Sequence, residues 1–189
     1  EPTAGGRHFG LLTTAGVRKP AFHAFQLLHN MGEIRLATQV LPPTEIAPAA
    51  NATVYALATT ERNTSTVVIK TMLSNHNCAP GVDAHANSSC SVLVSTPVQL
   101  QIIGWLAKTQ AQNQRCELTA AATLTRIDEQ HGNPKAAWVA MGSPNYPNTS
   151  ATAVLHAASK LHDEFIPVMA DRGTGTLTVT VDIPPEGVA

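Results

Sequence analysis

The chain has 189 residues, enough to bury a sizeable core but too few for two full domains without crowding. A formal net charge of -1 and a charged fraction of 13% exclude the strongly basic surface of a nucleic-acid or anionic-membrane binder. No apolar run approaches the roughly 20 residues of a membrane span, and the first residues lack the basic-then-apolar pattern of a signal peptide. We therefore expect neutral or protein partners, no nucleic acid and no membrane span.

The first predicted element is a helix from Lys19 to Met31, which follows the glycine-rich stretch "GGRHFGLLTTAGVR". Pro20 suits its first turn and Gly32 suits its end. Apolar side chains recur on nearly every turn: Ala21, Phe22, Ala24, Phe25, Leu27, Leu28 and Met31. This pattern predicts a helix that is covered on more than one side and a structural boundary near residue 33.

Beyond that boundary the sequence predicts mainly β structure. A Pro- and Ala-rich connector from Ile34 to Ala50 comes first. Strands are then expected at 53–60, 65–73, 90–96, 98–107 and 116–127. The closing strand is the clearest, because Leu177, Val179, Val181 and Ile183 alternate with Thr178, Thr180 and Asp182. Two short helices, within 133–144 and 148–161, interrupt the series, with Val154, Leu155, Ala158 and Leu161 on one side of the second.

Asparagine sequons suggest secretion. Four of the ten asparagines begin an Asn-X-Ser/Thr sequon, namely Asn51, Asn63, Asn87 and Asn148. We expect these side chains on the surface of a glycoprotein that is secreted or extracellular, or that resides in a lysosomal or vacuolar lumen. The alternative explanation is a threonine-rich sequence that contains such triplets by chance.

Cysteine placement agrees with an oxidising compartment. Cys78 and Cys90 flank a short polar loop that contains the Asn87 sequon, and a local disulfide is the prediction. A zinc site built from His76, Cys78, His85 and Cys90 is the alternative, but its spacing matches no common zinc module. Cys116 is left over, either as a buried thiol or as half of a bond to another chain. No metal is expected.

Motifs for catalysis are scarce. The sequence contains no nucleophile elbow, no phosphate-binding glycine motif and no metalloprotease His pair. The acidic pairs Asp128-Glu129 and Asp163-Glu164 are expected to be solvated capping groups, since adjacent carboxylates rarely face each other across a bond. We expect no cofactor.

Four stretches nevertheless resemble one family. "GGRHFGLLTTAGVRKPAFHAFQLLHNMG" is similar to the last strand end, loop and helix of the catalytic barrel of glycoside hydrolase family 39, the β-xylosidases and α-L-iduronidase. "TRIDEQHGNPKAAWVAMGSPNYP" resembles the strand and helix of that family's β-sandwich. "AVLHAASKL" and "LTVTVDIPP" occur where the family has its next helix and final strand.

The resemblance implies a mainly β fold, an antiparallel β-sandwich with short helices, preceded by the final loop-helix unit of a (β/α)8 barrel. Residues 1–33 would be that barrel unit, with the other units mostly on another polypeptide, and 34–189 the sandwich. The family's two catalytic glutamates lie on earlier strands, so this chain has no position to which either transfers. Arg7, His8 and Phe9 are candidates for a substrate loop, although a loop packed on its own barrel is the favoured explanation.

Two functions follow from these observations. The first is the non-catalytic, carboxy-terminal portion of a secreted glycosidase-like protein, which completes a catalytic barrel on a second polypeptide. The present chain would then be either one product of the proteolytic processing of a precursor or a degenerate homologue of the family. The alternative is an independent extracellular β-sandwich module with a structural or carbohydrate-binding role and no hydrolysis.

Overall fold

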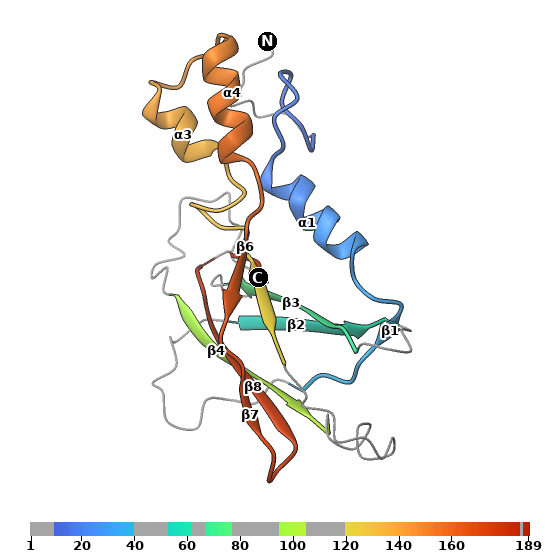
Figure 1. Cartoon of the computed structure of the whole chain (residues 1–189). Coiled ribbons are helices and arrows are strands. Elements are labelled where there is room, and N and C mark those ends of the chain that lie inside the picture. The colour runs from blue at the N-terminus through green and yellow to red at the C-terminus, as the bar shows by residue number, and fades with distance from the viewer. Residues whose placement is uncertain (1–9, 40–52, 62–66, 77–94, 105–119, 186) are drawn as a thin grey trace.

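The computed structural model describes residues 10–39, 53–61, 67–76, 95–104, 120–185 and 187–189 (Figure 1). Within these ranges the chain is mainly β, with short helices and antiparallel strand pairing throughout. The predicted mainly β class is confirmed at this level. Across the same ranges, no helix is long and apolar enough to cross a membrane.

Helix α1 (Pro20–His29) begins where the sequence predicted but ends earlier. Lys19 is its extended N-cap, and the backbone N–H of the C-cap Asn30 donates to the carbonyl of Gln26 at 3.1 Å. Gly32 lies beyond the helix and has a different role from the predicted one. A Cβ at Gly32 would lie 2.5 Å from the carbonyl oxygen of Thr60, so only glycine allows this close approach.

The first sheet contains β1 (Ile34–Arg35), β2 (Thr53–Thr60) and β3 (Ile69–His76), in the order β1-β2-β3. Strand β2 has its predicted bounds, and β1 is a short strand inside the predicted connector. Strand β3 is displaced from the predicted 65–73, because its pairing with β2 runs from Ile69 opposite Thr60 to His76 opposite Thr53.

The second sheet contains β4 (Thr96–Ile103), β8 (Thr176–Ile183) and β7 (Met169–Asp171), in the order β4-β8-β7. The predicted alternation in β8 is confirmed from Val179 to Ile183, whereas Leu177 and Thr178 are both half-buried. Val179, Val181 and Ile183 are buried, whereas Thr180 and Asp182 are exposed. The predicted strand at 98–107 stops at Ile103, since Gly104 takes a φ of +80°. The strand predicted at 90–96 lies almost wholly outside the described residues.

A third, two-stranded sheet pairs β5 (Ala122–Thr125) with β6 (Asp163–Ile166). The described part of the predicted 116–127 strand is therefore shorter than expected. Beyond β5, Ile127 forms an isolated bridge with Val188, where each backbone N–H donates to the other residue's carbonyl, at 2.8 and 2.9 Å.

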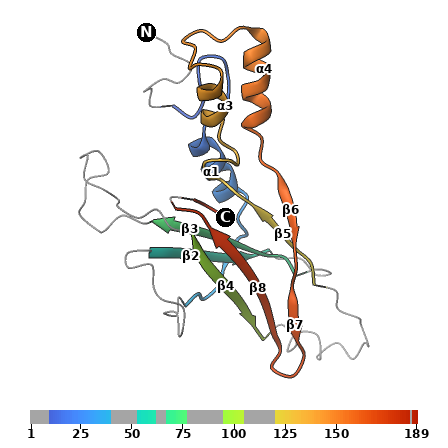
Figure 2. The same cartoon turned by 90° about the vertical axis from the view of Figure 1, so that its left-hand side faces the viewer.

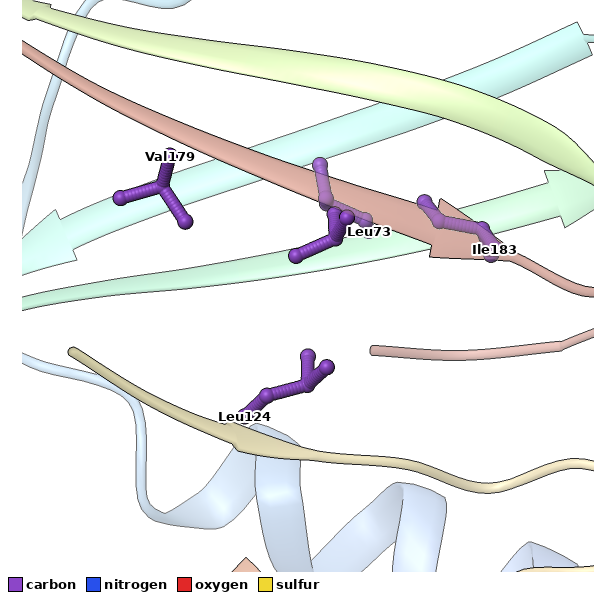
Figure 3. Packing of buried hydrophobic residues seen from close by; sticks show 5 residues of the cluster. Leu73, Leu124, Val179 and Ile183 are labelled. Carbon is purple, nitrogen blue, oxygen red and sulfur yellow. The ribbon is translucent and has the colours of Figure 1, made fainter. Parts of the chain in front are cut away.

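All three sheets contribute to one apolar core. Its buried members are Leu73 from β3, Leu124 from β5, and Val179, Val181 and Ile183 from β8 (Figure 3). Residues 187–189 tie the sheets together, because Leu73 and Ala189 exchange backbone hydrogen bonds at 2.6 and 2.9 Å. The buried Asn75 adds a side-chain link, donating from Nδ2 to the carbonyl of Ile183 at 3.0 Å.

Two helices, α3 (Lys135–Ala140) and α4 (Thr149–Ala158), lie beyond the sheets, together with the start of α1 (Figures 1 and 2). The indole Nε1 of Trp138 donates to the carbonyl of Pro144 at 3.0 Å and fixes the turn after α3. Leu155 is buried, as expected for the apolar side of α4. Val154, which the sequence places on the same side of the helix, is 51% exposed.

The described core predicts that substituting two isoleucines of the second sheet changes the free energy of unfolding by very different amounts. Ile183 is fully buried, whereas Ile103 on the neighbouring strand is 77% exposed. We expect Ile183→Ala to lower the free energy of unfolding by about 2–5 kcal/mol, because the cavity cannot close completely. Ile103→Ala should change it by less than about 0.5 kcal/mol. Urea unfolding of both variants gives the comparison, and equal losses would contradict the described core.

Candidate functional site

Most of the predicted functional residues lie outside the described residues. These are Arg7, His8, Phe9, Asn51, Asn63, Asn87, Cys78, Cys90 and Cys116, so the substrate loop and the disulfide stay predictions. Of the alternative zinc set, only the backbone of His76 is described, within β3. Among described residues, no group of three or more His, Cys, Asp or Glu side chains is arranged to hold a metal ion.

Asp128 caps the turn that follows β5. Its Oδ1 accepts hydrogen bonds from the backbone N–H groups of Gln130 at 2.7 Å and His131 at 2.8 Å. The backbone N–H of Asp128 donates back to the carbonyl of His131 at 3.1 Å. The prediction of a capping group is therefore right, but the prediction of a solvated one is wrong. The Asp128 side chain is only 5% exposed, whereas Glu129 beside it is exposed.

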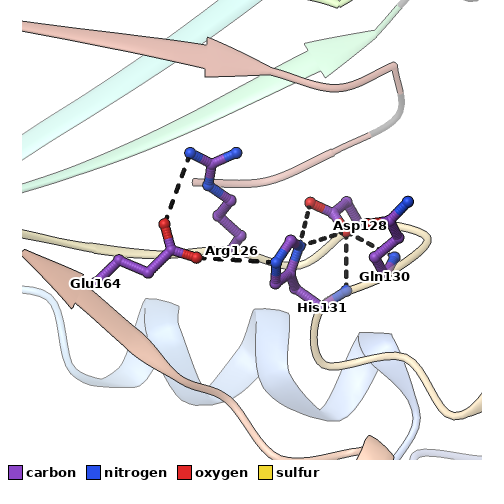
Figure 4. Close-up of polar contacts among 5 residues, drawn as sticks. All are labelled: Arg126, Asp128, Gln130, His131 and Glu164. Carbon is purple, nitrogen blue, oxygen red and sulfur yellow. Dashed lines mark hydrogen bonds and ion pairs between the residues drawn. The ribbon is translucent and has the colours of Figure 1, made fainter. Parts of the chain in front are cut away.

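His131 lies between two carboxylates from distant parts of the sequence (Figure 4). Its Nδ1 donates to Asp128, 2.8 Å from Oδ1 and 2.9 Å from Oδ2. Its Nε2 lies 3.8 Å from Oε1 of Glu164 on β6, and the other oxygen of Glu164 lies 3.8 Å from Nη2 of Arg126. We call Arg126, Asp128, His131 and Glu164 the polar cluster.

The surroundings of Asp128 stabilise its ionised form. Partial burial by itself would raise the pKa of this carboxyl group. Hydrogen bonds from the Gln130 backbone and from the side chain and backbone of His131 oppose that effect. The outcome is a pKa below the ordinary value of 3.8.

The contacts of the polar cluster fit a structural role and differ from those of a catalytic triad. In a nucleophilic triad, the imidazole nitrogen remote from the orienting carboxylate faces a hydroxyl or thiol. Here that nitrogen faces the carboxylate of Glu164. The cluster therefore joins the turn after β5 to strand β6. Arg126, Asp128 and His131 come from the "RIDEQH" run that carries part of the family resemblance, and Glu164 comes from β6.

A second connection, which the sequence did not predict, joins α1 to α4. His23 is 1% exposed, and its Nε2 donates to the carbonyl of Ser159 at 2.5 Å. Gly132 lies beside this contact with a φ of +61°, which favours glycine, and a Cβ there would lie 2.8 Å from Cδ2 of Leu161 and in ordinary contact with the His23 ring, at 3.5 Å. A buried histidine among apolar neighbours gives no periodic signal that identifies its distant acceptor.

The side of α1 opposite His23 carries large apolar side chains in water. Ala21, Phe25 and Leu28, spaced at i, i+4 and i+7, form what we call the α1 stripe. Phe25 is 62% exposed and Leu28 is 45% exposed. The only buried residue of the helix is His23. Among the residues that the structure describes, α1 is therefore buried on the side of His23 only.

Strand β6 presents another apolar side chain. Phe165 is 86% exposed and pairs with Thr123, whereas the next pair, Leu124 and Glu164, belongs to the face that contains the buried Leu124. Because successive residues of a strand point to opposite faces, Phe165 lies on the outer face of this sheet. Figure 3 shows α1 beyond β5, on the side away from the labelled Leu124.

The sequence is similar to one protein family and to a curated member of the same class of enzymes. The model of the family "Glycosyl hydrolases family 39" matches residues 5–176. A curated β-xylosidase of Caldicellulosiruptor saccharolyticus is 28% identical over 163 residues, which cover 86% of this chain and 26% of that protein.

One solved structure shows a related fold, and a second aligns over a similar share of both chains. The GH39 enzyme from Xanthomonas axonopodis pv. citri aligns with a TM-score of 0.58 at 17% identity, over 99% of this chain and 32% of that one. A monomeric β-xylosidase from Caulobacter crescentus CB15 aligns with a TM-score of 0.49 at 15% identity, over 95% and 31% of the two chains. This chain thus spans only 26% to 32% of the length of these proteins.

The depressed pKa of Asp128 predicts how its contribution to stability depends on pH. The stabilisation by Asp128 is fully present when the pH is above the pKa that this carboxyl group has in the unfolded state. It is lost as the pH falls through the lower pKa of the folded state. We expect Asp128→Ala to lower the free energy of unfolding by about 1–3 kcal/mol at pH 7, because two backbone donors lose their acceptor. The difference from the parent protein should narrow below about pH 4. Urea unfolding across this pH range measures it.

The matched control for this experiment is Glu129→Ala, which changes the exposed neighbouring carboxylate. It should alter the free energy of unfolding by less than about 0.5 kcal/mol at each pH. A loss in Asp128→Ala that stays constant from pH 7 to pH 2 would contradict the linkage.

Proposed function

The chain belongs to glycosyl hydrolases family 39, and from this premise we propose that it forms the carboxy-terminal, non-catalytic portion of a secreted glycosidase-like protein. In this proposal the chain packs on a catalytic barrel and completes it. Residues 1–33 supply the last barrel unit, and 34–189 fold as a β-sandwich against it. The barrel is carried mostly by a second polypeptide, which contributes the catalytic glutamates.

The observation that supports this proposal most is that most of this chain matches the family, although the chain is much shorter than its relatives. Residues 5–176 match the family model, yet the chain corresponds to only 26% of the β-xylosidase and 32% of the GH39 enzyme. The remainder of such proteins has room for a barrel of about 250 residues. Because one relative is a β-xylosidase, an aryl β-xyloside is the first substrate to test on the assembled protein.

The α1 stripe supports the proposed packing. Helices of a (β/α)8 barrel form an outer ring and bury apolar side chains against the strands and neighbouring helices. Covering Phe25 and Leu28 would gain about 1.5–3 kcal/mol for each fully buried side chain. The occupant that we propose for this surface is the rest of the barrel.

The opposite side of α1 is suited to hold the barrel unit against the sheets. His23 donates to the carbonyl of Ser159, and the carboxyl end of α4 leads into β6. Strand β6 in turn carries Glu164 of the polar cluster. The His23 contact and the chain segment from α4 into β6 therefore link α1 to the β structure, so a polypeptide bound on the α1 stripe would also be held beside the sheets.

The proposal predicts that charge on the α1 stripe prevents assembly. We expect Phe25→Asp and Leu28→Asp in residues 1–189 to reduce capture of a family 39 barrel polypeptide at least tenfold, since each places a carboxylate in an apolar contact. Captured material is identified by mass spectrometry and assayed for β-xyloside hydrolysis. Val154→Asp on α4 is the matched control, because Val154 is also about half exposed, at 51%.

Equal capture by all three variants would contradict docking at the α1 stripe. Capture of a barrel polypeptide without glycosidase activity would support the packing but contradict the catalytic part of the proposal.

A further inference from the structure

Asn148 caps helix α4 and also begins the triplet Asn148-Thr149-Ser150. Its side-chain Oδ1 accepts a hydrogen bond from the backbone N–H of Ala151 at 2.8 Å, and its backbone is extended, with φ -69° and ψ 176°. All three residues of the triplet are exposed. We propose that Asn148 is an N-glycosylation site whose Oδ1 continues to cap α4 after a glycan is attached to Nδ2. The proposal rests on the secretion part of the proposed function.

The two roles use different atoms of the same amide. Capping requires only the acceptor lone pair of Oδ1, and the N-glycosidic bond forms at Nδ2. The amide group is planar, so fixing Oδ1 toward Ala151 directs Nδ2 away from the helix backbone. Since the residues around this nitrogen are exposed, a glycan could extend into water without unfolding the first turn of α4.

The covalent step needs only a conventional sugar donor. Nδ2 of Asn148 attacks C1 of the first sugar of a lipid-linked oligosaccharide pyrophosphate, and an N–C1 bond forms. The C1–O bond to the pyrophosphate breaks, the lipid pyrophosphate leaves as an anion, and one amide proton passes to solvent. No oxidant or reductant takes part.

The position of this site constrains how the protein assembles. The carboxyl end of α4 leads into β6, so its amino end is the end remote from the sheets (Figure 1). A glycan there must remain in solvent. A second polypeptide can therefore cover the α1 stripe, on the other side of the His23 connection, but cannot cover the start of α4.

The test uses the full protein secreted from a eukaryotic cell, with four variants. Ser150→Ala removes the sequon but keeps the asparagine cap. Asn148→Asp removes the nitrogen to which the glycan would be attached but keeps a capping oxygen. Thr149→Ala is the matched control, because Asn-Ala-Ser is still a sequon. Glycopeptide mass spectrometry should find a glycan at residue 148 in the parent and in Thr149→Ala, and none in Ser150→Ala or Asn148→Asp.

The fourth variant separates the cap from the glycan. Asn148→Ala and Ser150→Ala both lack the glycan, but only the first lacks the cap. We expect the unfolding midpoint of Asn148→Ala to lie roughly 2–6 °C below that of Ser150→Ala. Equal midpoints would overturn the capping role.

The mass spectra also distinguish this proposal from the one on which it rests. A bare Asn148 alongside glycans at Asn51, Asn63 or Asn87 would overturn the site and leave secretion intact. Bare asparagines at all four sequons would contradict both this site and the secretion part of the proposed function.

Discussion

Large apolar side chains of α1 are exposed to water, which limits how stable this helix is within the described residues. A ten-residue helix is marginal in water and owes most of its stability to packing. Its packed side is secured by His23, which is buried, while Phe25 and Leu28 on the other side remain in contact with water. A helix in this state is stabilised fully only when a second apolar surface covers it.

Polar contacts do much of the joining between the elements of this chain. The apolar core is small and is built mainly on β8, with single buried residues from β3 and β5. Residues 187–189 join the first sheet to the turn after β5 through backbone hydrogen bonds, and the polar cluster joins that turn to β6. Strand β6 follows α4 in the chain, and His23 joins the end of α4 to α1, so these contacts fix α1 relative to the sheets. The contacts of the polar cluster therefore agree with a role in holding these elements together.

Local patterns in the sequence predicted the elements that have a clear period. Strand β8 was predictable because its side chains alternate strictly, and α1 because apolar residues recur on each turn. The short strands β6 and β7 were not, since "DEFIPVMAD" has charged residues at its ends and a proline within it. Contacts between distant residues were also beyond a single sequence. His23 and Ser159 are 136 positions apart, and no local pattern connects Asp128 with Glu164 through His131. The family could be predicted because "RIDEQHGNP" and the α1 segment are specific combinations of residues.

The most direct measurement is the association state and dye binding of residues 1–189 produced alone. Light scattering after size-exclusion chromatography gives the molar mass, and a dye that fluoresces on apolar surface reports whether the α1 stripe is covered. If the chain is the terminal portion of a barrel-containing protein, it should bind the dye strongly and self-associate, and a barrel polypeptide should suppress both effects. A soluble monomer without dye binding would contradict this and would indicate an independent module.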